Sequence, residues 1–207
     1  MIARERPATA EAEGALVLLH GRGADEHDLF PLLDVLDPER RLHGYTPRGP
    51  LALPPGGAHW YVVPRVGYPD PGTFRESYGA LAAWVDSLPY ERVVVGGFSQ
   101  GCVMALSLGL GGALERRPFA VCGFSGFVPT VDGWAIDACR PLPPVALGHG
   151  TQDSVIPVEL GRAARDAVLA AGGELLYQEY PLTHALDPQF VVAVREWLWA
   201  KWGTAAP

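Results

Sequence analysis

The sequence contains few cysteines and no long hydrophobic segment. Its cysteines are Cys102, Cys122 and Cys139, whose spacing fits no zinc-binding pattern and whose odd number argues against a disulfide framework. No stretch approaches the roughly 18 apolar residues that a membrane-spanning helix needs. The charged N-terminal segment 1–14 lacks the apolar core of a signal peptide. We therefore expect a cytoplasmic protein in a reducing compartment, without integral membrane association.

Basic residues are scarce and are not clustered. The chain has 16 lysines and arginines against 23 aspartates and glutamates, which gives a formal net charge of -7 at pH 7. A negative chain without a basic patch binds nucleic acid poorly, because the phosphate backbone repels it. Nucleic acid is therefore excluded as an expected partner.

The chain also lacks internal repeats, low-complexity segments and linker-like stretches. Its 25 glycines and 20 prolines are spread along 207 residues, of which 48% are hydrophobic and 19% charged. These proportions are typical of a compact globular protein. We expect residues 1–207 to form a single domain.

Short hydrophobic runs alternate along the chain with segments of helical periodicity. After a short strand around Tyr45, the segment 42–74 is rich in glycine, proline and aromatic residues, which indicates a long irregular connection. Strands that alternate with helices imply an α/β fold, with a mostly parallel sheet and helices on both faces. The other expected strands are 15–20, 92–98, 119–126, 143–150 and 174–180, and the expected helices begin near Asp25 or span 74–88, 100–112, 158–173 and 187–202.

Residues with reactive side chains follow several of the predicted strands. In a parallel sheet, ligands bind beyond the carboxyl ends of the strands. We therefore expect the functional residues at that edge, where the sequence places the segment 20–25 and the side chains of Ser99, Ser125, Asp153 and His184.

Ser99 lies in the sequence Gly97-Phe98-Ser99-Gln100-Gly101, between a predicted strand and a predicted helix. In that context the G-x-S-x-G pattern is typical of a nucleophile elbow, a sharp strained turn that exposes a serine hydroxyl. Glycines on both sides of the serine remove Cβ atoms where such a turn needs room. The alternative interpretation is a packing turn that happens to contain a serine.

The hydroxyl of a serine needs a neighbouring base at neutral pH, and imidazole is suited to that role. Among the six histidines, His184 lies between the last predicted strand and the last predicted helix, in a loop that can reach back over Ser99. His184 is therefore the predicted base, and an ordinary loop histidine is the alternative. We expect His20 and His149, which directly follow strands, to fix loops by hydrogen bonding. The remaining histidines are expected at the surface: His27, His43 and His59.

An imidazole base needs a carboxylate that holds its tautomer and stabilises its protonated form. Asp153 follows a predicted strand and a polar turn, and the chain order Ser99, Asp153, His184 is the order used by sheet enzymes with a nucleophile elbow. Asp153 is therefore the predicted acid. The alternatives are Glu179, inside a predicted strand, and Asp187, where the last helix is expected to be capped.

Attack on a carbonyl carbon creates an oxyanion, which backbone amides can stabilise. The amide of Gln100 is expected at a helix N-terminus, and the amide of Arg22 lies in the glycine-rich turn after the first predicted strand. Gly21 and Gly23 allow the backbone of that turn to approach a substrate. We therefore predict the amides of Arg22 and Gln100 as oxyanion donors, with an ordinary tight turn as the alternative for this segment.

Several long segments together point to one protein family. They are "LVLLHGRGADEHDL", "GGFSQGCVMALSL", "FSGFVP", "GHGTQDSVIPVELGRAARDAVLAAGGELLYQEYPLTHALDP" and the closing amphipathic helix. Over nearly its whole length the chain resembles the phospholipase/carboxylesterase branch of the α/β-hydrolase superfamily, which includes small bacterial carboxylesterases and acyl-protein thioesterases. The resemblance implies a compact α/β-hydrolase fold without a large lid. It also implies Ser99 as nucleophile, Asp153 as acid, His184 as base, and oxyanion donors at Arg22 and Gln100.

The chain departs from the family pattern at three places. Family members often have a bulky apolar residue where Arg22 stands, which leaves the backbone role intact but changes what its side chain meets. They often have an acidic residue where Ala185 follows His184. The chain also begins close to its first obvious strand, which indicates a trimmed sheet without some edge strands.

A set of large apolar residues is expected to form the substrate-binding wall near Ser99. An apolar wall favours acyl or aryl groups, and the absence of a lid insertion argues against long-chain triglycerides. The alternative is that these side chains seal the core, as large aromatic residues often do. The candidate residues are Trp60, Tyr61, Phe127, Val155 and Leu186.

These residues predict a serine hydrolase of the carboxylesterase type that cleaves short to medium esters or thioesters through an acyl-enzyme. The expected partner is a small-molecule substrate, and no metal or organic cofactor is required, since Asp25 and His27 alone make a weak metal site. Other interpretations are a catalytically silent binding module for a small apolar ligand, and lysophospholipid, peptide or perhydrolase chemistry by the same residues. The oligomeric state stays open between monomer and homodimer.

Overall fold

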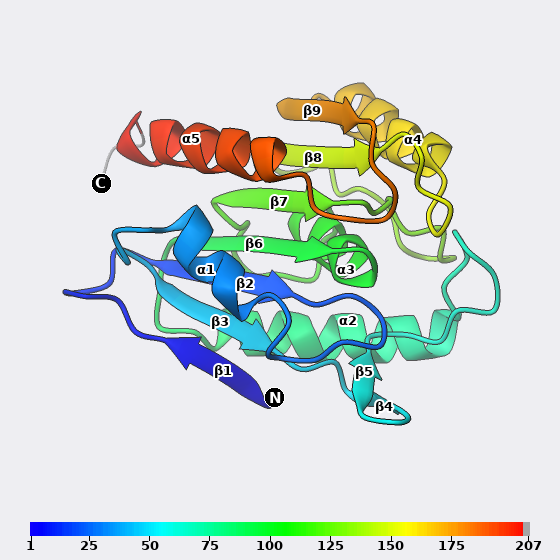
Figure 1. Ribbon diagram of the computed structural model, residues 1–207, viewed down its shortest axis with the longest axis horizontal. Coiled ribbons are helices and arrows are strands. Elements are labelled where there is room, and N and C mark those ends of the chain that lie inside the picture. The colour runs from blue at the N-terminus through cyan, green and yellow to red at the C-terminus, as the bar shows by residue number, and fades with distance from the viewer. Residues whose placement is uncertain (205–207) are drawn as a thin grey trace.

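The computed structural model describes residues 1–204, which form a seven-stranded sheet, a separate two-stranded hairpin and five helices (Figure 1). From the second strand onward, helices separate most strands of the large sheet, and the last two strands before the fourth helix follow one another directly. The strands are β1 (Ala3–Arg6), β2 (Ala15–Leu19), β3 (His43–Pro47), β4 (Leu51–Leu53), β5 (Gly57–His59), β6 (Val93–Phe98), β7 (Ala120–Phe124), β8 (Val145–Gly150) and β9 (Leu175–Tyr180). The helices are α1 (Phe30–Leu36), α2 (Pro71–Asp86), α3 (Gln100–Leu110), α4 (Val158–Ala170) and α5 (Pro188–Thr204).

The large sheet has the strand order β1-β3-β2-β6-β7-β8-β9, and every strand in it is parallel to its neighbours except β1. The carboxyl ends of the parallel strands lie together, on the right-hand side of Figure 1. The chain leaves β2 toward β3 on one side and later returns to β6 on the other, so the direction of winding reverses at β2. Loops after β2 and β6 therefore separate at this point, which is where ligands bind in open parallel sheets.

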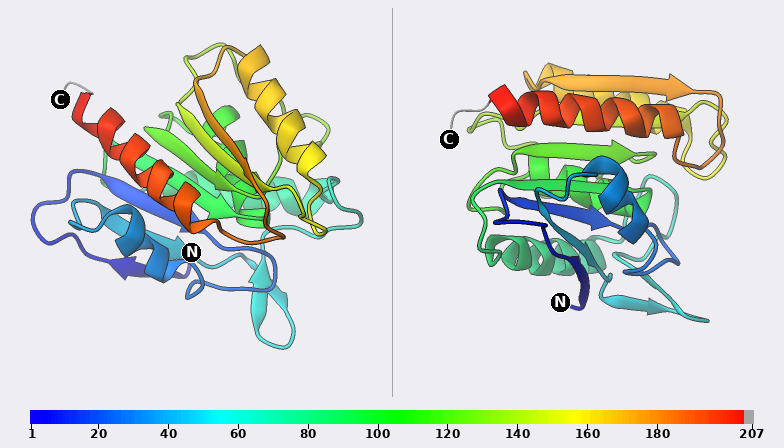
Figure 2. Two further views of the ribbon diagram at one scale, coloured as in Figure 1. Left: turned by 45° about the horizontal axis from the view of Figure 1, so that its top comes forward. Right: turned by 60° about the vertical axis from the view of Figure 1, so that its left-hand side comes forward.

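Alternate residues of the central strands point into two separate hydrophobic layers. In β2, Ala15, Val17 and Leu19 pack in the layer that also contains residues of α2, α3 and α4. Leu16 and Leu18 pack on the opposite side, with residues of α1 and α5. Figure 2 shows the sheet between these two helical layers. The predicted fold class, a mostly parallel sheet with helices on both faces, is confirmed.

The predicted helix near Asp25 is wrong, because α1 begins only at Phe30. The Asp25 side chain instead accepts the amide of His27 at 2.9 Å, and its carbonyl oxygen accepts the amide of Asp28 at 3.2 Å. An aspartate that hydrogen-bonds two residues ahead forms a turn rather than entering a helix. The segment after β2 is therefore a loop at the sheet edge.

The structure contains three strands that the sequence-based expectation lacks. The connection predicted as irregular contains the hairpin of β4 and β5, which pair antiparallel. At the N-terminus, β1 adds an antiparallel edge strand next to β3, although its residues Ala3–Arg6 have no apolar run. Short polar strands of this kind carry no periodicity signal, because their pairing is decided by partners far away in the sequence.

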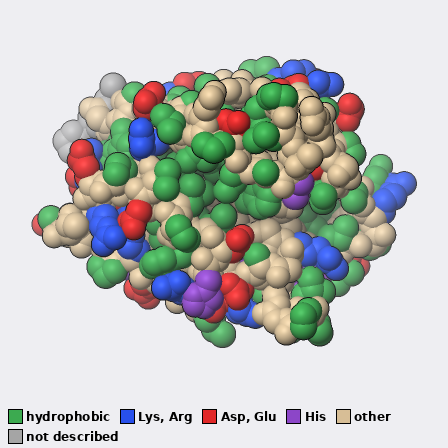
Figure 3. Space-filling view, in the orientation of Figure 1, with side chains coloured by type: hydrophobic (Ala, Val, Ile, Leu, Met, Phe, Trp, Pro, Cys, Tyr) green, Lys and Arg blue, Asp and Glu red, His purple; other side chains and the backbone are tan. Residues whose placement is uncertain are grey.

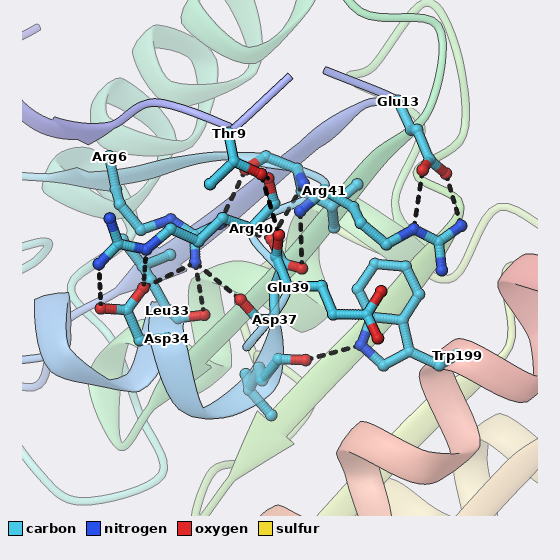
Figure 4. Close-up of polar contacts among 12 residues, drawn as sticks. Arg6, Thr9, Glu13, Leu33, Asp34, Asp37, Glu39, Arg40, Arg41 and Trp199 are labelled. Atoms are coloured by element: carbon cyan, nitrogen blue, oxygen red, sulfur yellow. Dashed lines mark hydrogen bonds and ion pairs between the residues drawn. The ribbon is translucent and has the colours of Figure 1, made fainter. Parts of the chain in front are cut away.

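A buried ion pair holds β1 against the loop that follows α1 (Figure 4). The side chains of Arg6 and Asp37 are 3% and 0% exposed, and the guanidinium pairs directly with the carboxylate. Arg6 also donates to the carbonyl oxygens of Leu33 and Leu42, at 2.9 and 2.7 Å. The Asp37 carboxylate accepts the amides of Arg41 and Leu42, at 3.0 and 2.9 Å. The pair is thus supported by hydrogen bonds on both sides.

The surface has mixed charge on the face shown in Figure 3. Lys and Arg side chains there are scattered among Asp and Glu, and hydrophobic side chains gather in and around a hollow at the centre of the described part of that face. Within residues 1–204, no helix combines the length and the apolar character that crossing a bilayer requires.

The buried ion pair generates a stability prediction. We expect Asp37→Asn to lower the free energy of unfolding by about 3 kcal/mol, because the neutral amide removes the buried counter-charge of Arg6 and leaves it only the half-exposed carboxylate of Asp34, at 3.1 Å. Urea denaturation followed by circular dichroism measures the change. Glu159→Gln is the control, because Glu159 is 71% exposed in its ion pair with Arg162 and its loss should cause no measurable change. Equal stabilities of Asp37→Asn and the parent chain would contradict the assigned role.

Candidate active site

Ser99 occupies the turn between β6 and α3 in a strained backbone conformation. Its φ and ψ angles are 56° and -118°, in a region that residues with a Cβ rarely adopt. The Ser99 amide donates to the carbonyl oxygen of Phe124 on β7 at 2.9 Å, and its own carbonyl oxygen accepts the amide of Val103 at 3.2 Å. The turn is therefore held from the neighbouring strand and from the first turn of the helix.

The two glycines of the G-x-S-x-G pattern are required by close backbone approach. A Cβ at Gly97 would lie 2.5 Å from the carbonyl group of Gly101, and a Cβ at Gly101 would lie 1.9 Å from the carbonyl oxygen of Leu19. No side chain fits at either distance. The glycines two residues before and two residues after Ser99 thus allow α3 to begin directly against the ends of β2 and β6.

His184 approaches Ser99 from the far end of the sequence. It lies in the segment between β9 and α5, drawn in orange in Figure 1, which turns back across the carboxyl ends of the central strands. Its Nε2 atom is 2.8 Å from the hydroxyl oxygen of Ser99, and its ring packs on the ring of Phe98 with 4.7 Å between centroids. The loop thus brings an imidazole within hydrogen-bonding distance of the serine.

Asp153 completes the line on the other side of the imidazole. The Nδ1 atom of His184 lies 2.6 Å from Oδ2 of Asp153, whose side chain is fully buried. The other carboxylate oxygen accepts the amides of Val155 and Ile156, at 2.9 and 2.8 Å. An ionised carboxylate accepts a hydrogen bond from Nδ1–H, which leaves Nε2 unprotonated and able to accept the hydroxyl proton of Ser99.

The two alternative acids have other partners. Glu179 in β9 pairs with Arg162 and accepts a hydrogen bond from Tyr177 at 3.0 Å. Asp187 accepts the amide of Phe190 at 2.8 Å, as the cap of α5. Asp153 is therefore the carboxylate that the structure brings to His184, although its role in a reaction stays a prediction.

The other histidines divide between buried residues that hydrogen-bond the backbone and residues at the surface. The expectation that His20 and His149 fix loops is confirmed. The ring of His20 hydrogen-bonds the carbonyl oxygen of Gly21 and accepts the amide of Gly49. The ring of His149 lies 2.8 Å from the carbonyl oxygen of Ile156. His27 is 61% exposed, and His43 is partly exposed beside Glu5. The surface expectation is wrong for His59, which is 8% exposed and hydrogen-bonds the carbonyl oxygen of Tyr61.

The turn that contains Arg22 lies beside Ser99. A Cβ at Gly21 would be 3.5 Å from the Cβ of Ser99, so the two backbones are nearly in contact. The turn is tied to β5 by the amide of Gly23, which donates to the carbonyl oxygen of Ala58 at 2.8 Å, and by the return bond from Ala58 to Ala24 at 2.7 Å. The amide of Arg22 is therefore held at the edge of the site by its neighbours.

Gln100 contributes to the site through its position and its side chain. As the first residue of α3, it has an amide without an intrahelical acceptor. Its side-chain oxygen accepts the amide of Trp60 at 2.8 Å, and its side-chain nitrogen donates to the carbonyl oxygen of Tyr61 at 2.7 Å. The sequence offered no signal for this bracing role beyond a polar residue next to the serine.

A cavity of about 300 Å³ opens at Ser99. Three of the predicted substrate-binding residues line it, namely Tyr61, Phe127 and Val155. Trp60 does not, because it is fully buried and donates its indole N–H to the carbonyl oxygen of His20. Leu186 packs against the hydrophobic layer of α1 and α5 instead. The full lining is Arg22, Tyr61, Val63, Arg65, Val66, Gly67, Tyr68, Pro69, Ser99, Gln100, Phe127, Val155 and Ile156.

Metal-ligating side chains do not gather at this edge. Within residues 1–204, no three side chains of His, Cys, Asp or Glu lie close enough together to hold an ion. Asp25 and His27, the weak pair noted in the sequence, are joined by the backbone hydrogen bond of a turn.

Comparisons with known proteins agree on one family and one fold. A family model described as Phospholipase/Carboxylesterase matches residues 73–201. The chain is 27% identical over 217 residues to acyl-protein thioesterase 1 of Yarrowia lipolytica, with 93% of each chain covered. Its structure is similar to the Bacillus cereus carboxylesterase, with a TM-score of 0.83, 21% identity, and 96% and 93% of the two chains covered. Zea mays acyl-protein thioesterase 2 gives a TM-score of 0.78 at 24% identity, over 97% and 98% of the two chains.

The anchoring histidine of the Arg22 turn generates a prediction of pH dependence. Burial lowers the pKa of His20 below its ordinary value of 6.5, so the unfolded chain binds a proton there more readily than the folded chain. Stability contributed at this position is therefore lost as the pH falls through about 6.5. We expect the stability advantage of the parent chain over His20→Gln to shrink between pH 8 and pH 5, as measured by urea denaturation. An advantage that grows on acidification would contradict this.

Proposed function

The chain belongs to the phospholipase/carboxylesterase family and is a carboxylic-ester hydrolase, and we propose that it cleaves its substrate through Ser99, His184 and Asp153. The observation that carries the proposal is the continuous hydrogen-bonded line from the Ser99 hydroxyl through His184 to Asp153, with heavy-atom distances of 2.8 and 2.6 Å. Such a line supplies the base that a serine nucleophile needs and the carboxylate that holds the base in the correct tautomer.

In the first half of the reaction, Oγ of Ser99 attacks the carbonyl carbon of an ester or thioester while its proton moves to Nε2 of His184. The buried carboxylate of Asp153 stabilises the imidazolium that forms. Collapse of the tetrahedral intermediate breaks the bond to the alcohol or thiol, which leaves with the proton from Nε2. The product of this half is an acyl group on Ser99.

In the second half, water enters in place of the leaving group. The water oxygen attacks the acyl carbon while His184 takes a proton from the water. That proton then moves to Oγ of Ser99 as the carboxylic acid departs. Both halves use the same residues, so the proposal requires no metal or organic cofactor.

The negative charge on the tetrahedral intermediate needs fixed donors close to Ser99. We assign this role to the amides of Arg22 and Gln100. The Gln100 amide is free at the N-terminus of α3, and the Arg22 turn lies against Ser99 and is anchored to β5. Donors fixed before the reaction cost no reorganisation in the transition state, and removing one typically costs about 3 kcal/mol.

The size and lining of the cavity support short to medium acyl groups. A volume of about 300 Å³ is at the small end of ligand sites. Tyr61, Phe127 and Ile156 provide apolar contacts next to Ser99. An acyl chain of a few carbons fits this space, whereas a long chain extends past the rim into solvent.

Loss of the nucleophile tests the proposed reaction. We expect Ser99→Ala to lower kcat/KM for 4-nitrophenyl butyrate by at least about 1,000-fold and to abolish covalent labelling by a fluorophosphonate, because Ser99 supplies the hydroxyl that contacts His184. Ser107→Ala is the matched control, since Ser107 is buried in α3 and bonds only the carbonyl oxygen of Val103. A folded parent chain that is neither labelled nor active would favour the silent binding module.

A chain-length series tests the assigned substrate class. We expect kcat/KM for 4-nitrophenyl esters to be highest between about two and eight acyl carbons and to fall for longer chains, because the cavity beside Ser99 accommodates only a short apolar group. Initial rates at substrate concentrations below the micelle limit provide the measurement. A steady rise up to sixteen carbons would contradict this class.

A further inference from the structure

The charged side chains that line the cavity at Ser99 are of one sign. Arg22 and Arg65 line it, and no aspartate or glutamate does. This lining differs from the chain as a whole, which has an excess of acidic residues and a net charge of -7. The cavity beside Ser99 is therefore lined by positive charge and by no carboxylate.

Neither arginine has an acidic partner in the described part of the chain. Among residues 1–204, no carboxylate lies at ion-pair distance from Arg22 or Arg65, although both side chains are exposed. The exposed Arg40, by contrast, is paired with Asp34 at 3.0 Å. The donor groups of the two cavity arginines are thus available to a ligand.

Arg65 is held in place by a tight loop. The amide of Tyr68 donates to the carbonyl oxygen of Arg65 at 3.0 Å, and the amide of Asp70 donates to that of Val62 at 2.9 Å. Gly67, at the tip, has a φ of 82° and its carbonyl oxygen accepts the hydroxyl of Thr130. The loop is closed on itself and fastened to a neighbouring segment, so its side chains start from a fixed backbone.

The Arg65 guanidinium is also fixed by stacking. Its central carbon lies 3.6 Å from the centre of the Tyr68 ring, and both residues line the cavity. Stacking occupies the face of a guanidinium and leaves the N–H groups along its edge free to bind an oxyanion in bidentate fashion. Arg65 is therefore positioned for a ligand before the ligand arrives.

Arg22 provides the second positive group, nearer to the reacting centre. It is the residue after Gly21, whose backbone lies against Ser99, and it lines the cavity together with Gln100. The apolar contacts lie on the same walls, at Tyr61 and Phe127. The cavity thus combines apolar surface with two cationic groups.

We propose that this cavity selects esters or thioesters that carry an anionic oxyacid group, a carboxylate or a phosphate, which Arg65 binds while stacked on Tyr68 and Arg22 supports. The inference rests on the proposed function and specifies its substrate class. Guanidinium groups bind both oxyacids in the same bidentate geometry. Because the site is open to solvent, the attraction is screened by salt.

A matched pair of substrates tests the selection. Mono-4-nitrophenyl glutarate and 4-nitrophenyl pentanoate have acyl chains of equal length, and only the first has a terminal carboxylate. We expect Arg65→Gln to lower the ratio of kcat/KM for the glutarate over the pentanoate by about tenfold, mainly through KM of the glutarate. Tyr68→Leu should lower the ratio by a smaller factor, because it removes the stacking but keeps the charge. Raising the salt concentration should lower the ratio of the parent chain.

Arg116→Gln is the matched control, because Arg116 is exposed and lies outside this cavity. We expect it to leave the ratio unchanged. Competition by free glutarate and by inorganic phosphate separates the two sources of the oxyacid. Stronger inhibition by glutarate indicates carboxylate substrates, and stronger inhibition by phosphate indicates phosphate-bearing ones.

The outcomes separate this inference from the proposed function. If pentanoate is hydrolysed and Ser99 is labelled, but the ratio is the same in Arg65→Gln and neither anion competes, the anion site is wrong and the proposed reaction stands. If no ester is hydrolysed, the proposed reaction fails. Calorimetric binding of glutarate or inorganic phosphate that is weakened by Arg65→Gln then still supports the anion site, and binding that is unaffected overturns it.

Discussion

The whole site depends on how closely the N-terminus of α3 approaches the ends of β2 and β6. There is no room for a side chain at Gly97 or Gly101, because backbone atoms occupy the space that a Cβ would need. This contact places Ser99 in its strained conformation and brings the Arg22 turn against it. Strain at one residue costs about 1–3 kcal/mol, and the parallel pairing of β6 with both β2 and β7 holds the turn in place.

Buried hydrogen bonds, rather than the loops themselves, set the geometry around Ser99. His20 ties the Arg22 turn to the segment at Gly49, and the Asp153 carboxylate binds two amides of its own loop while it faces His184. His184 thereby connects the loop of Asp153 with the turn of Ser99. This arrangement pre-positions the groups that the proposed reaction uses, which is how hydrogen-bonded sites reduce reorganisation during a reaction.

Sequence reasoning predicted the strands and helices that carry a clear apolar pattern. It missed the strands that are ordered by contacts with residues far away in the sequence. The strand before Ser99 and the fully buried α3 carry strong apolar patterns. By contrast, β1 is polar and is ordered by the buried pair of Arg6 and Asp37. The hairpin of β4 and β5 lies in a glycine- and proline-rich stretch without alternation, and the turns at Asp25 replaced an expected helix.

By itself, the sequence determined the order of the central strands and of the helices that follow them from α2 onward, the turn around Ser99, and the family, because these depend on local patterns and on motifs of fixed spacing. Only the tertiary structure decided which loops meet. It joined Ser99, Asp153 and His184 by hydrogen bonds, buried Trp60 away from the cavity, and stacked Arg65 on Tyr68 at its wall. Such contacts join segments far apart in the chain, so they follow from how the helices and strands pack and not from any local pattern.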